Sequence, residues 1–382
     1  MTLRVLHAPG IAGGNAAELA RAERALGLDS RCVAFDENPM DYEVDERVAP
    51  SAGRLRFEVA RWRWLWRAWR DFDVIHFNFG QSFMPQYLPA AGPGSGFTAP
   101  LRALYRRYAR WMELRDIAFL KSRGKVVFMT YQGDDARQGD YCRSHFEITF
   151  ADKVPPGYYT NASDTAKRRR IATVDRCAHG IFALNPDLLH VLPPRARFLP
   201  YANVDLRQWA PEADTGNVRP VLVHAPSHTA VKGTDIVVEV VRRLKASGAD
   251  FDFVLVQGRT RSEALAAYRR ADLCIDQLFA GWYGGLAVEL MALGKPVATF
   301  LRENDLHFLP DRMRAELPLV RVTPSTLFEV LRGLLAQPRD EWVRIGVASR
   351  KFVEQWHDPL RIAGQLRGAY QAALATREAP GI

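Results

Sequence analysis

The sequence has few cysteines and no long apolar run. Its four cysteines, Cys32, Cys142, Cys177 and Cys274, are scattered without the spacing of metal ligands or of a disulfide framework, so we expect buried free thiols in a reducing compartment. No apolar run approaches the roughly 20 residues that span a bilayer. The chain starts directly with a strand-like segment at residues 3–7, without a signal-peptide pattern. We therefore expect a globular, cytoplasmic protein.

Acidic residues are fewer than basic ones. The 43 aspartates and glutamates face 52 lysines and arginines, which gives a formal charge of +9 and a pI near 9.5. Nucleic acid, an anionic membrane surface or an anionic metabolite would each suit this balance, and so would high arginine usage without any partner. No nucleic-acid-binding module is recognisable, so we expect no nucleic-acid partner.

The length and the order of predicted elements indicate two α/β domains. The 382 residues, 48% of them hydrophobic, suffice for two domains with cores of their own. Predicted strands at residues 3–7 and 31–35 flank a helix, and this order predicts a parallel sheet. The alternation starts again at residues 220–224. We expect a first domain at residues 1–205, a linker at 206–219, a second domain at 220–350, and C-terminal helices at 351–382 that pack back on the first domain.

One glycine-rich stretch, residues 276–297, combines the features of an anion site. A buried strand ends at Ile275, Gly281, Gly284 and Gly285 follow, and a helix then starts. Glycines before a helix expose backbone N–H groups at its positive end, where phosphates are commonly bound. The carboxylate of Glu289, one turn into the helix, is placed to reach a ribose hydroxyl. The stretch therefore predicts a sugar-nucleotide site.

Polar residues follow two predicted strands of the first domain. Ligands of open parallel sheets bind beyond the carboxyl ends of the strands, so these residues are candidates for contacts with a second substrate. Asp134 and Asp135 are each either a base or hydroxyl-binding group, or a cap of a turn. The candidates are His76, Asn78, Gln132, Asp134, Asp135 and Arg137.

Two segments, at residues 54–70 and 101–115, are rich in arginine and aromatic residues. In the first, Leu55, Val59, Trp62, Trp66 and Trp69 recur at helical spacing and form one stripe. Arginine and tryptophan together suit an anionic lipid interface. The alternative is that the tryptophan stripe packs on the sheet and the arginines are merely solvated, and both interpretations stay open.

Taken together, these patterns resemble the GT-B glycosyltransferases, in particular their large retaining family four. The resemblance covers most of the chain and is most specific over residues 220–300. Lys232-Gly233 matches the family's Lys-Gly pair, whose lysine neutralises the donor diphosphate. Residues 284–297 match the second half of the family's E-x7-E segment and the Met-Ala-x-Gly-x-Pro-Val run after it. Glu289 then corresponds to the ribose-binding glutamate, the backbone of residues 284–287 to the pyrophosphate site, and Gly13 and Gly14 to a loop that closes over the donor.

The sequence departs from the family pattern at three places. The first glutamate of E-x7-E falls on Gly281, so a carboxylate usually placed near the sugar is absent. The arginine five residues before the Lys-Gly pair falls on Ser227, with His228 adjacent. The His-Gly at the strand end of the first domain is Gln132-Gly133. The first two departures lie in the donor site and the third on the acceptor side.

The resemblance implies an α/β GT-B fold with two Rossmann-like domains whose parallel sheets face each other across a cleft. It also implies transfer of a hexosyl unit from a nucleotide diphosphate sugar to a hydroxyl of a glycan or lipid-linked acceptor, with retention, in cell-surface polysaccharide or glycolipid synthesis. The alternative is a catalytically silent or epimerase-like nucleotide-sugar-binding protein. No metal or cofactor is expected, because lysine and a helix dipole can stabilise a leaving diphosphate. Peripheral contact with the inner face of an anionic membrane is part of the prediction. The candidate residues are Lys232, Asp134 and Gln132 for catalysis; Gly13, Gly14, Ser227, His228, Lys232, Gln257, Gly258, Gly281, Gly284, Gly285, Leu286 and Glu289 for the donor; and His76, Asn78, Asp135 and Arg137 for the acceptor.

Overall fold

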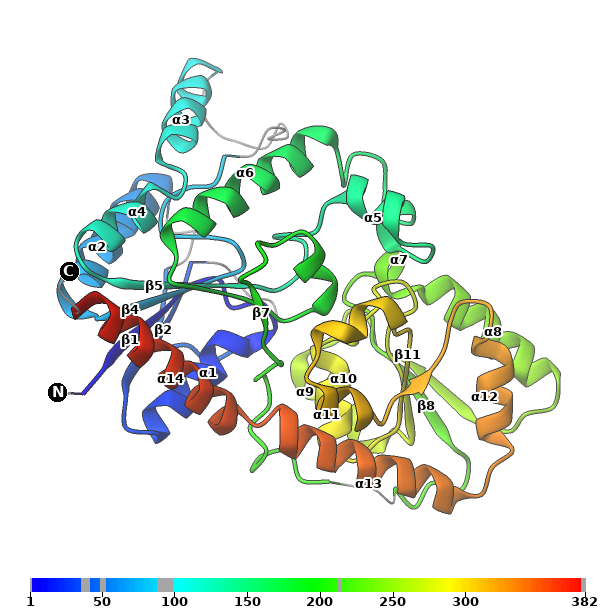
Figure 1. Ribbon diagram of the computed structural model, residues 1–382. Coiled ribbons are helices and arrows are strands. Elements are labelled where there is room, and N and C mark those ends of the chain that lie inside the picture. The colour runs from blue at the N-terminus through cyan, green and yellow to red at the C-terminus, as the bar shows by residue number, and fades with distance from the viewer. Residues whose placement is uncertain (1, 36–41, 49–52, 88–98, 212–214, 379–382) are drawn as a thin grey trace. The chain divides into compact units, whose positions relative to one another are not determined.

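The chain forms two compact units, which we call unit 1 and unit 2. The computed structural model describes residues 2–35, 42–48, 53–87, 99–211 and 215–378 (Figure 1). Unit 1 comprises Met1–Tyr141, Tyr159–Leu199 and Leu360–Ile382, and unit 2 comprises Cys142–Tyr158 and Pro200–Pro359. No helix among the described residues is both long enough and apolar enough to cross a membrane.

Unit 1 is built on a parallel sheet, which has seven strands within the described residues, in the order β3-β2-β1-β4-β5-β6-β7. The central strands β4 and β5 are buried along their whole length. Their apolar runs are typical of parallel strands that are covered on both faces. The strands are β1 (Arg4–Pro9), β2 (Asp29–Ala34), β3 (Glu46–Arg47), β4 (Val74–Asn78), β5 (Val126–Tyr131), β6 (Gly180–Ala183) and β7 (Arg197–Phe198).

Helices cover this sheet, and the last helix of the chain is one of them. Tyr370 of α14 is fully buried and bonds to His76 of β4 and to Glu23 of α1, so α14 is part of the core of unit 1 (Figure 1). The elements are η1 (Ala12–Gly14), α1 (Asn15–Ala25), α2 (Arg54–Asp71), α3 (Ala99–Met112), α4 (Arg115–Ser122), α6 (Asn161–Cys177), η4 (Pro186–His190) and α14 (Pro359–Glu378). Helix α5 (Gly139–His145) begins in unit 1 and ends in unit 2.

Unit 2 contains the second parallel sheet, of five strands within the described residues, in the order β12-β11-β10-β8-β9. The strands are β8 (Val221–His224), β9 (Asp252–Leu255), β10 (Leu273–Ile275), β11 (Val297–Thr299) and β12 (Val320–Arg321). The other elements are η3 (Phe150–Asp152), α7 (Thr229–Lys232), α8 (Thr234–Ala246), α9 (Arg261–Arg270), α10 (Gly285–Ala292), η5 (Glu303–Phe308), α11 (Asp311–Ala315), α12 (Leu327–Leu335) and α13 (Arg339–Trp356).

Two helices of unit 2 show how the sequence pattern determines burial. In α8 the residues Val237, Val240, Val241 and Leu244 are buried, at the i, i+3, i+4, i+7 spacing of one helix face. In α10, by contrast, all residues from Ala287 to Ala292 are buried, as expected for a helix whose residues are apolar on every side except at Glu289. Helix α10 is therefore a core element, and its start is fixed in the unit.

The observed division of the chain differs from the expected domain bounds. Residues 142–158 lie in unit 2. The chain then passes from unit 1 to unit 2 for a long stretch after Leu199, whereas the sequence predicted a linker at 206–219. Residues 212–214 of that predicted linker lie outside the described residues. Arg350 of α13 explains part of this, because its guanidinium bonds to the carbonyl oxygens of Trp209 and Ala292. That contact ties both the expected linker and the helix through residue 356 to unit 2. The C-terminal segment that belongs to unit 1 starts at Leu360, and residues 379–382 are not described.

Candidate functional site

Lys232 is the last residue of the short helix α7, which follows β8 after a loop of residues 225–228. The next residue, Gly233, has a φ of +74°, which favours glycine. A Cβ there would also lie 3.0 Å from the ring of Phe279 and 3.1 Å from Leu278. Glycine at this point therefore allows the loop after β8 to approach the loop after β10. The side chain of Lys232 is only 10% exposed, and its Nζ lies 2.7 Å from Oδ1 of Asp276.

Asp276 joins the two groups that the sequence analysis assigned to a phosphate. It follows β10 directly and is fully buried. One carboxylate oxygen accepts from the ammonium of Lys232, and the other accepts from the backbone N–H of Gly284 at 3.0 Å. A Cβ at Gly284 would lie 3.4 Å from Nζ of Lys232. A lysine and an amide that precedes α10 thus already converge on a single anionic group.

Glu289 lies one turn into α10 and is buried. No described residue donates a hydrogen bond to its carboxyl group. Burial raises the pKa of Glu289 to about 7, and the charge of Arg261 opposes this only in part. An ionised carboxylate that lacks hydrogen bonds is costly in such a place. Glu289 therefore has the capacity to accept a hydrogen bond from a ligand hydroxyl.

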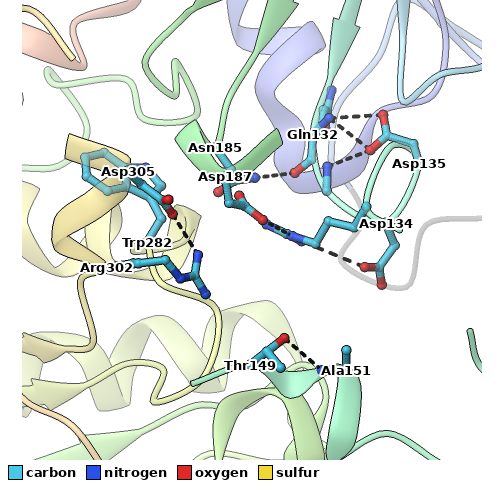
Figure 2. A network of polar contacts seen from close by, with 12 residues as sticks. Gln132, Asp134, Asp135, Thr149, Ala151, Asn185, Asp187, Trp282, Arg302 and Asp305 are labelled. Carbon is cyan, nitrogen blue, oxygen red and sulfur yellow. Dashed lines mark hydrogen bonds and ion pairs between the residues drawn. The ribbon is translucent and has the colours of Figure 1, made fainter. Parts of the chain in front are cut away.

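A guanidinium fills the space beside Gly281. With a φ of +80°, Gly281 is in the left-handed region, and a Cβ on it would lie 2.6 Å from Cζ of Arg302. Arg302 donates to Asp305 at 2.7 Å (Figure 2). It also donates to the carbonyl of Ile148 at 3.0 Å. It also stacks at 3.6 Å from the ring centroid of Phe146. A cation thus borders the position at which the family resemblance expects a glutamate.

A cavity of about 420 Å³ lies beside Arg302 within unit 2. Its wall combines two phenylalanine rings with charged and hydroxyl groups, and an ion pair between Arg321 and Glu303 is part of it. Such a mixture of apolar faces and a few polar groups is typical of small-molecule sites. The lining includes Phe146, Phe300, Arg302, Glu303, Arg321 and Thr323.

The remaining donor-side candidates lie at strand ends or at the start of α10. Ser227 and His228 are exposed after β8, and Gln257 and Gly258 are exposed after β9. Leu286, in the first turn of α10, is half-buried. Unit 2 therefore brings Lys232, Gly284 and Gly285 close together, while the exposed candidates make few contacts of their own.

Three polar residues near these groups were not singled out from the sequence. Asp276 and Arg302 are described above, and Asn203 donates to the carbonyl of Gly285 at 3.2 Å. Its side-chain oxygen is buried and accepts no hydrogen bond among the described residues. A carboxylate directly after a strand was a usable signal for Asp276. Asn203 is 82 positions from Gly285, and no local pattern indicates that contact.

In unit 1 the candidate residues after β5 mainly bind one another. Arg137 forms a two-point ion pair with Asp187, with Nε 2.5 Å from Oδ2 and Nη2 3.1 Å from Oδ1. Asp135 accepts from the backbone N–H groups of Gln132 and Gly133 (Figure 2), and burial raises its pKa to about 6. Asp135 therefore caps the turn, which was one of the two interpretations left open for it.

Asp134 and Gln132 keep more freedom than their neighbours. The carboxylate of Asp134 is 34% exposed, accepts from the hydroxyl of Tyr159 at 2.5 Å and lies 3.8 Å from the guanidinium of Arg137. The amide of Gln132 is half-buried and lies 3.5 Å from Oδ1 of Asn78. These two side chains are the members of the group that a second substrate can still reach.

His76 and Asn78 are buried completely. The two ring nitrogens of His76 lie 2.6 Å from the hydroxyl of Tyr370 and 2.7 Å from that of Thr130. Burial holds the pKa of His76 well below its usual value, so the ring is a neutral member of the core. Asn78 donates to the carbonyl of His76. Strand alternation at β4 directs the His76 ring into the core, and we do not retain it among the acceptor contacts.

Gly13 and Gly14 lie in η1, between β1 and α1. Both have positive φ values, +64° and +72°, and a Cβ on Gly14 would lie 2.6 Å from the ring of Tyr42. Gly13 is exposed, and nothing lies within 4 Å of its Cβ position. The loop thus presents a bare backbone at Gly13, whereas Gly14 is glycine for reasons of packing and conformation.

Comparison with solved structures identifies the fold. The chain superposes on sucrose-phosphate synthase from Thermosynechococcus elongatus with a TM-score of 0.62 and 15% identity, over 98% of this chain and 100% of that one. HepE of Anabaena, solved in complex with UDP-glucose, superposes with a TM-score of 0.58 and 12% identity, over 97% of this chain and 100% of that one. A protein from Listeria monocytogenes that is described as a putative UDP-N-acetylglucosamine 2-epimerase superposes with a TM-score of 0.52 and 11% identity, over 100% of this chain and 98% of that one.

The fold is GT-B. Two parallel sheets and full-length matches on both sides bear out the predicted fold class. No family model matches the sequence, and no curated protein does. At 11–15% identity the neighbours give the GT-B fold and no more. Among the described residues, no group of three or more histidine, cysteine, aspartate or glutamate side chains is placed to hold a metal ion.

Proposed function

We propose that the protein is a glycosyltransferase that moves a hexosyl unit from a nucleotide diphosphate sugar to a hydroxyl group. One observation carries this proposal: the ammonium of Lys232 and the N–H of Gly284 converge on one anionic group at the start of α10. In the structure the carboxylate of Asp276 is that group. Two negatively charged oxygens held by a lysine and a loop amide are also what a diphosphate requires.

The chemistry follows from the charges that the loops bring together. As the sugar leaves, negative charge grows on the diphosphate, and the Lys232 ammonium and the amides at the start of α10 stabilise it without a metal ion. An ammonium has three N–H groups, so Lys232 can keep Asp276 and still bind a phosphate oxygen. Glu289 would accept a hydrogen bond from the ribose. Retention of configuration is supported only by the resemblance to family four.

The acceptor we propose is a glycan or a lipid-linked hydroxyl compound of cell-surface polysaccharide or glycolipid synthesis. Asp134 and Gln132 are the side chains proposed to meet it, since Arg137 is bound to Asp187 and Asp135 to backbone N–H groups. The protein would work in the cytoplasm, at the inner face of the membrane, without a nucleic-acid partner or a cofactor. The aromatic and cationic side chains of α2 and α3 support the membrane part.

A thermal-shift panel of UDP-, GDP-, dTDP- and ADP-sugars tests the donor site. A ligand that binds only the folded protein raises the melting temperature by mass action, so we expect one base to give a clear shift. The Lys232→Ala variant should lose at least about tenfold in affinity and turnover, which corresponds to a charge-assisted hydrogen bond of about 1.5–3 kcal/mol. The Lys245→Ala variant, altered at an exposed lysine of α8, is the matched control.

Lys232→Ala alone leaves Asp276 buried without its counter-ion, and this can lower stability for reasons unrelated to the donor. The double variant Lys232→Ala/Asp276→Asn removes both charges and separates the two effects. If it melts like the parent protein and still does not bind the nucleotide, the loss belongs to the lysine. A panel in which no nucleotide shifts the melting curve would overturn the donor-site proposal.

The alternative is a nucleotide-sugar-binding protein that is silent or epimerase-like. The guanidinium of Arg302 beside Gly281 favours it, because the carboxylate expected near the sugar is missing, and one structural neighbour is described as an epimerase. Incubation of the tightest donor without acceptor distinguishes the candidates. A transferase should hydrolyse it slowly, an epimerase should interconvert it with a second sugar, and a silent binder should leave it unchanged.

A further inference from the structure

Helix α2 has two apolar faces, and only one of them packs in unit 1. Trp64, Leu65 and Ala68 are buried in the core. The stripe recognised in the sequence is a different one, and all its members are exposed: Leu55, Val59, Trp62, Trp66 and Trp69. Leu55 is 80% exposed and Trp66 48%. The interpretation that this stripe packs on the sheet therefore does not apply.

Helix α3, which hydrogen-bonds to α2, also exposes apolar side chains. Its side chains Leu101, Leu104 and Trp111 are exposed by 50% or more. We call the exposed apolar side chains of α2 and α3, with the arginines among them, the α2–α3 face. Within the described part of the chain, every exposed tryptophan lies on it. Unit 2, by comparison, exposes mainly separate valines, Val218, Val238, Val254 and Val347 among them.

A half-buried carboxylate fixes α3 to α2. Glu58 of α2 accepts from the hydroxyls of Tyr105 at 2.6 Å and Tyr108 at 3.3 Å. The indole N–H of Trp62 in turn donates to Tyr108 at 3.1 Å. Burial and the bond to Glu58 raise the pKa of Tyr105, so its hydroxyl stays protonated as a donor. The face is thus a formed surface of two connected helices.

Its charge is strongly positive. Helix α2 carries six arginines and α3 four, against one glutamate and one aspartate, both on α2. The two acids cancel only part of this charge, because Glu58 pairs with Arg61 at 3.2 Å and Asp71 pairs with Arg70 at 2.5 Å. Arg70 lies 4.0 Å above the ring of Trp66, and Arg115, at the start of α4, lies 4.7 Å above that of Trp111. Cations and indole rings alternate over the same surface.

We propose that the α2–α3 face binds the surface of an anionic lipid bilayer. Tryptophan rings favour the headgroup region, leucine tips at Leu55, Leu101 and Leu104 can enter the acyl boundary, and arginines meet lipid phosphates. Neither a nucleic acid nor an acidic protein would require the exposed leucines. The inference deepens the membrane part of the proposed function. It concerns unit 1 alone, and its test does not depend on nucleotide binding by unit 2, so failure of the membrane surface and failure of the donor site can be told apart.

Sedimentation of the full chain with lipid vesicles tests this surface. Vesicles of phosphatidylcholine with phosphatidylglycerol should bind the protein, vesicles of phosphatidylcholine alone should bind it much less, and salt should weaken the binding. The variant Trp66→Ser/Trp69→Ser/Trp111→Ser should lose at least about tenfold in affinity for anionic vesicles. Its control is Val238→Ser/Val347→Ser, which removes exposed apolar side chains from unit 2. A thermal melt and the nucleotide affinity show that each variant is folded.

A second variant isolates the charge. Arg63→Gln/Arg107→Gln should reduce binding to anionic vesicles only, and Arg242→Gln/Arg344→Gln, altered at exposed arginines of unit 2, should not. Equal binding of the parent protein to neutral and anionic vesicles would overturn the proposal. So would a tryptophan variant that binds like the parent. A concentration-dependent dimer that the tryptophan variant abolishes would replace the bilayer with a second copy of the chain.

Discussion

The carboxyl ends of the two parallel sheets carry similar residues and use them differently. In unit 1, Arg137 and Asp187 neutralise each other, and Asp135 is occupied by backbone N–H groups. In unit 2, Lys232 has one ion-pair partner and Glu289 has no hydrogen-bond partner among the described residues. Polar residues at a strand end are therefore not a sufficient sign of a ligand site. What distinguishes the two ends is how many hydrogen bonds the protein itself leaves unmade.

The largest effect should come from breaking the ion pair of unit 1. Arg137→Met leaves the Asp187 carboxylate buried without its counter-ion, which typically costs about 3–5 kcal/mol of stability. We expect a clear fall in melting temperature and an unchanged affinity for the nucleotide that binds in the panel. Differential scanning calorimetry and isothermal titration measure the two quantities on the same sample.

The double variant Arg137→Met/Asp187→Leu is the control for this comparison. Apolar residues of similar volume often replace a buried pair at little cost, so the double variant should recover most of the stability. A loss of nucleotide affinity in Arg137→Met, at a temperature where it is folded, would contradict the purely structural role of the pair. It would then make Arg137 part of the site.

A smaller effect is expected at Glu289, and it depends on pH. Its folded-state pKa of about 7 lies above the ordinary value of 4.5, so the folded chain keeps a proton that the unfolded chain releases. The contribution to stability is complete below about pH 4.5 and is lost as pH rises to about 7, by roughly 3 kcal/mol in total. The Glu289→Gln variant should lack this decline and be more stable than the parent at pH 8. Melting curves across this pH range measure it.

Nucleotide binding should show the reverse dependence on pH. A ribose hydroxyl that donates to Glu289 favours the ionised carboxylate, so affinity should rise severalfold between about pH 6 and pH 8, with release of a proton. Titration calorimetry in buffers of different ionisation enthalpy counts that proton. An affinity that is flat over this range, or equally pH-dependent in Glu289→Gln, would separate Glu289 from the ribose.

The fold and part of the site could be predicted from the sequence because their signals are local. The βαβ order, the Lys232-Gly233 pair and the glycines before α10 each occupy one short stretch. The contacts of Arg302 could not be predicted, since its carbonyl partner Ile148 is 154 positions away. The face of α2 was ambiguous for a different reason. Both of its faces are apolar, and helical periodicity alone does not tell which one the sheet covers.

The smallest effect is expected from a substitution that adds a cation of the family pattern to the strand ends of unit 2. Ser227 is exposed after β8, at the position where the resemblance expects a second cation. The Ser227→Arg variant should strengthen binding of the nucleoside diphosphate by about twofold to fivefold, in line with an exposed ion pair of about 0.5–1 kcal/mol, and leave binding of the nucleoside unchanged. Ser247→Arg, at the far end of α8, adds the same charge away from the loops and controls for net charge. Equal gains in both variants would show a general electrostatic effect. A gain in Ser227→Arg alone would show that the diphosphate lies over this loop. The site in unit 2 would then still lack a positive charge, unlike the strand ends of unit 1.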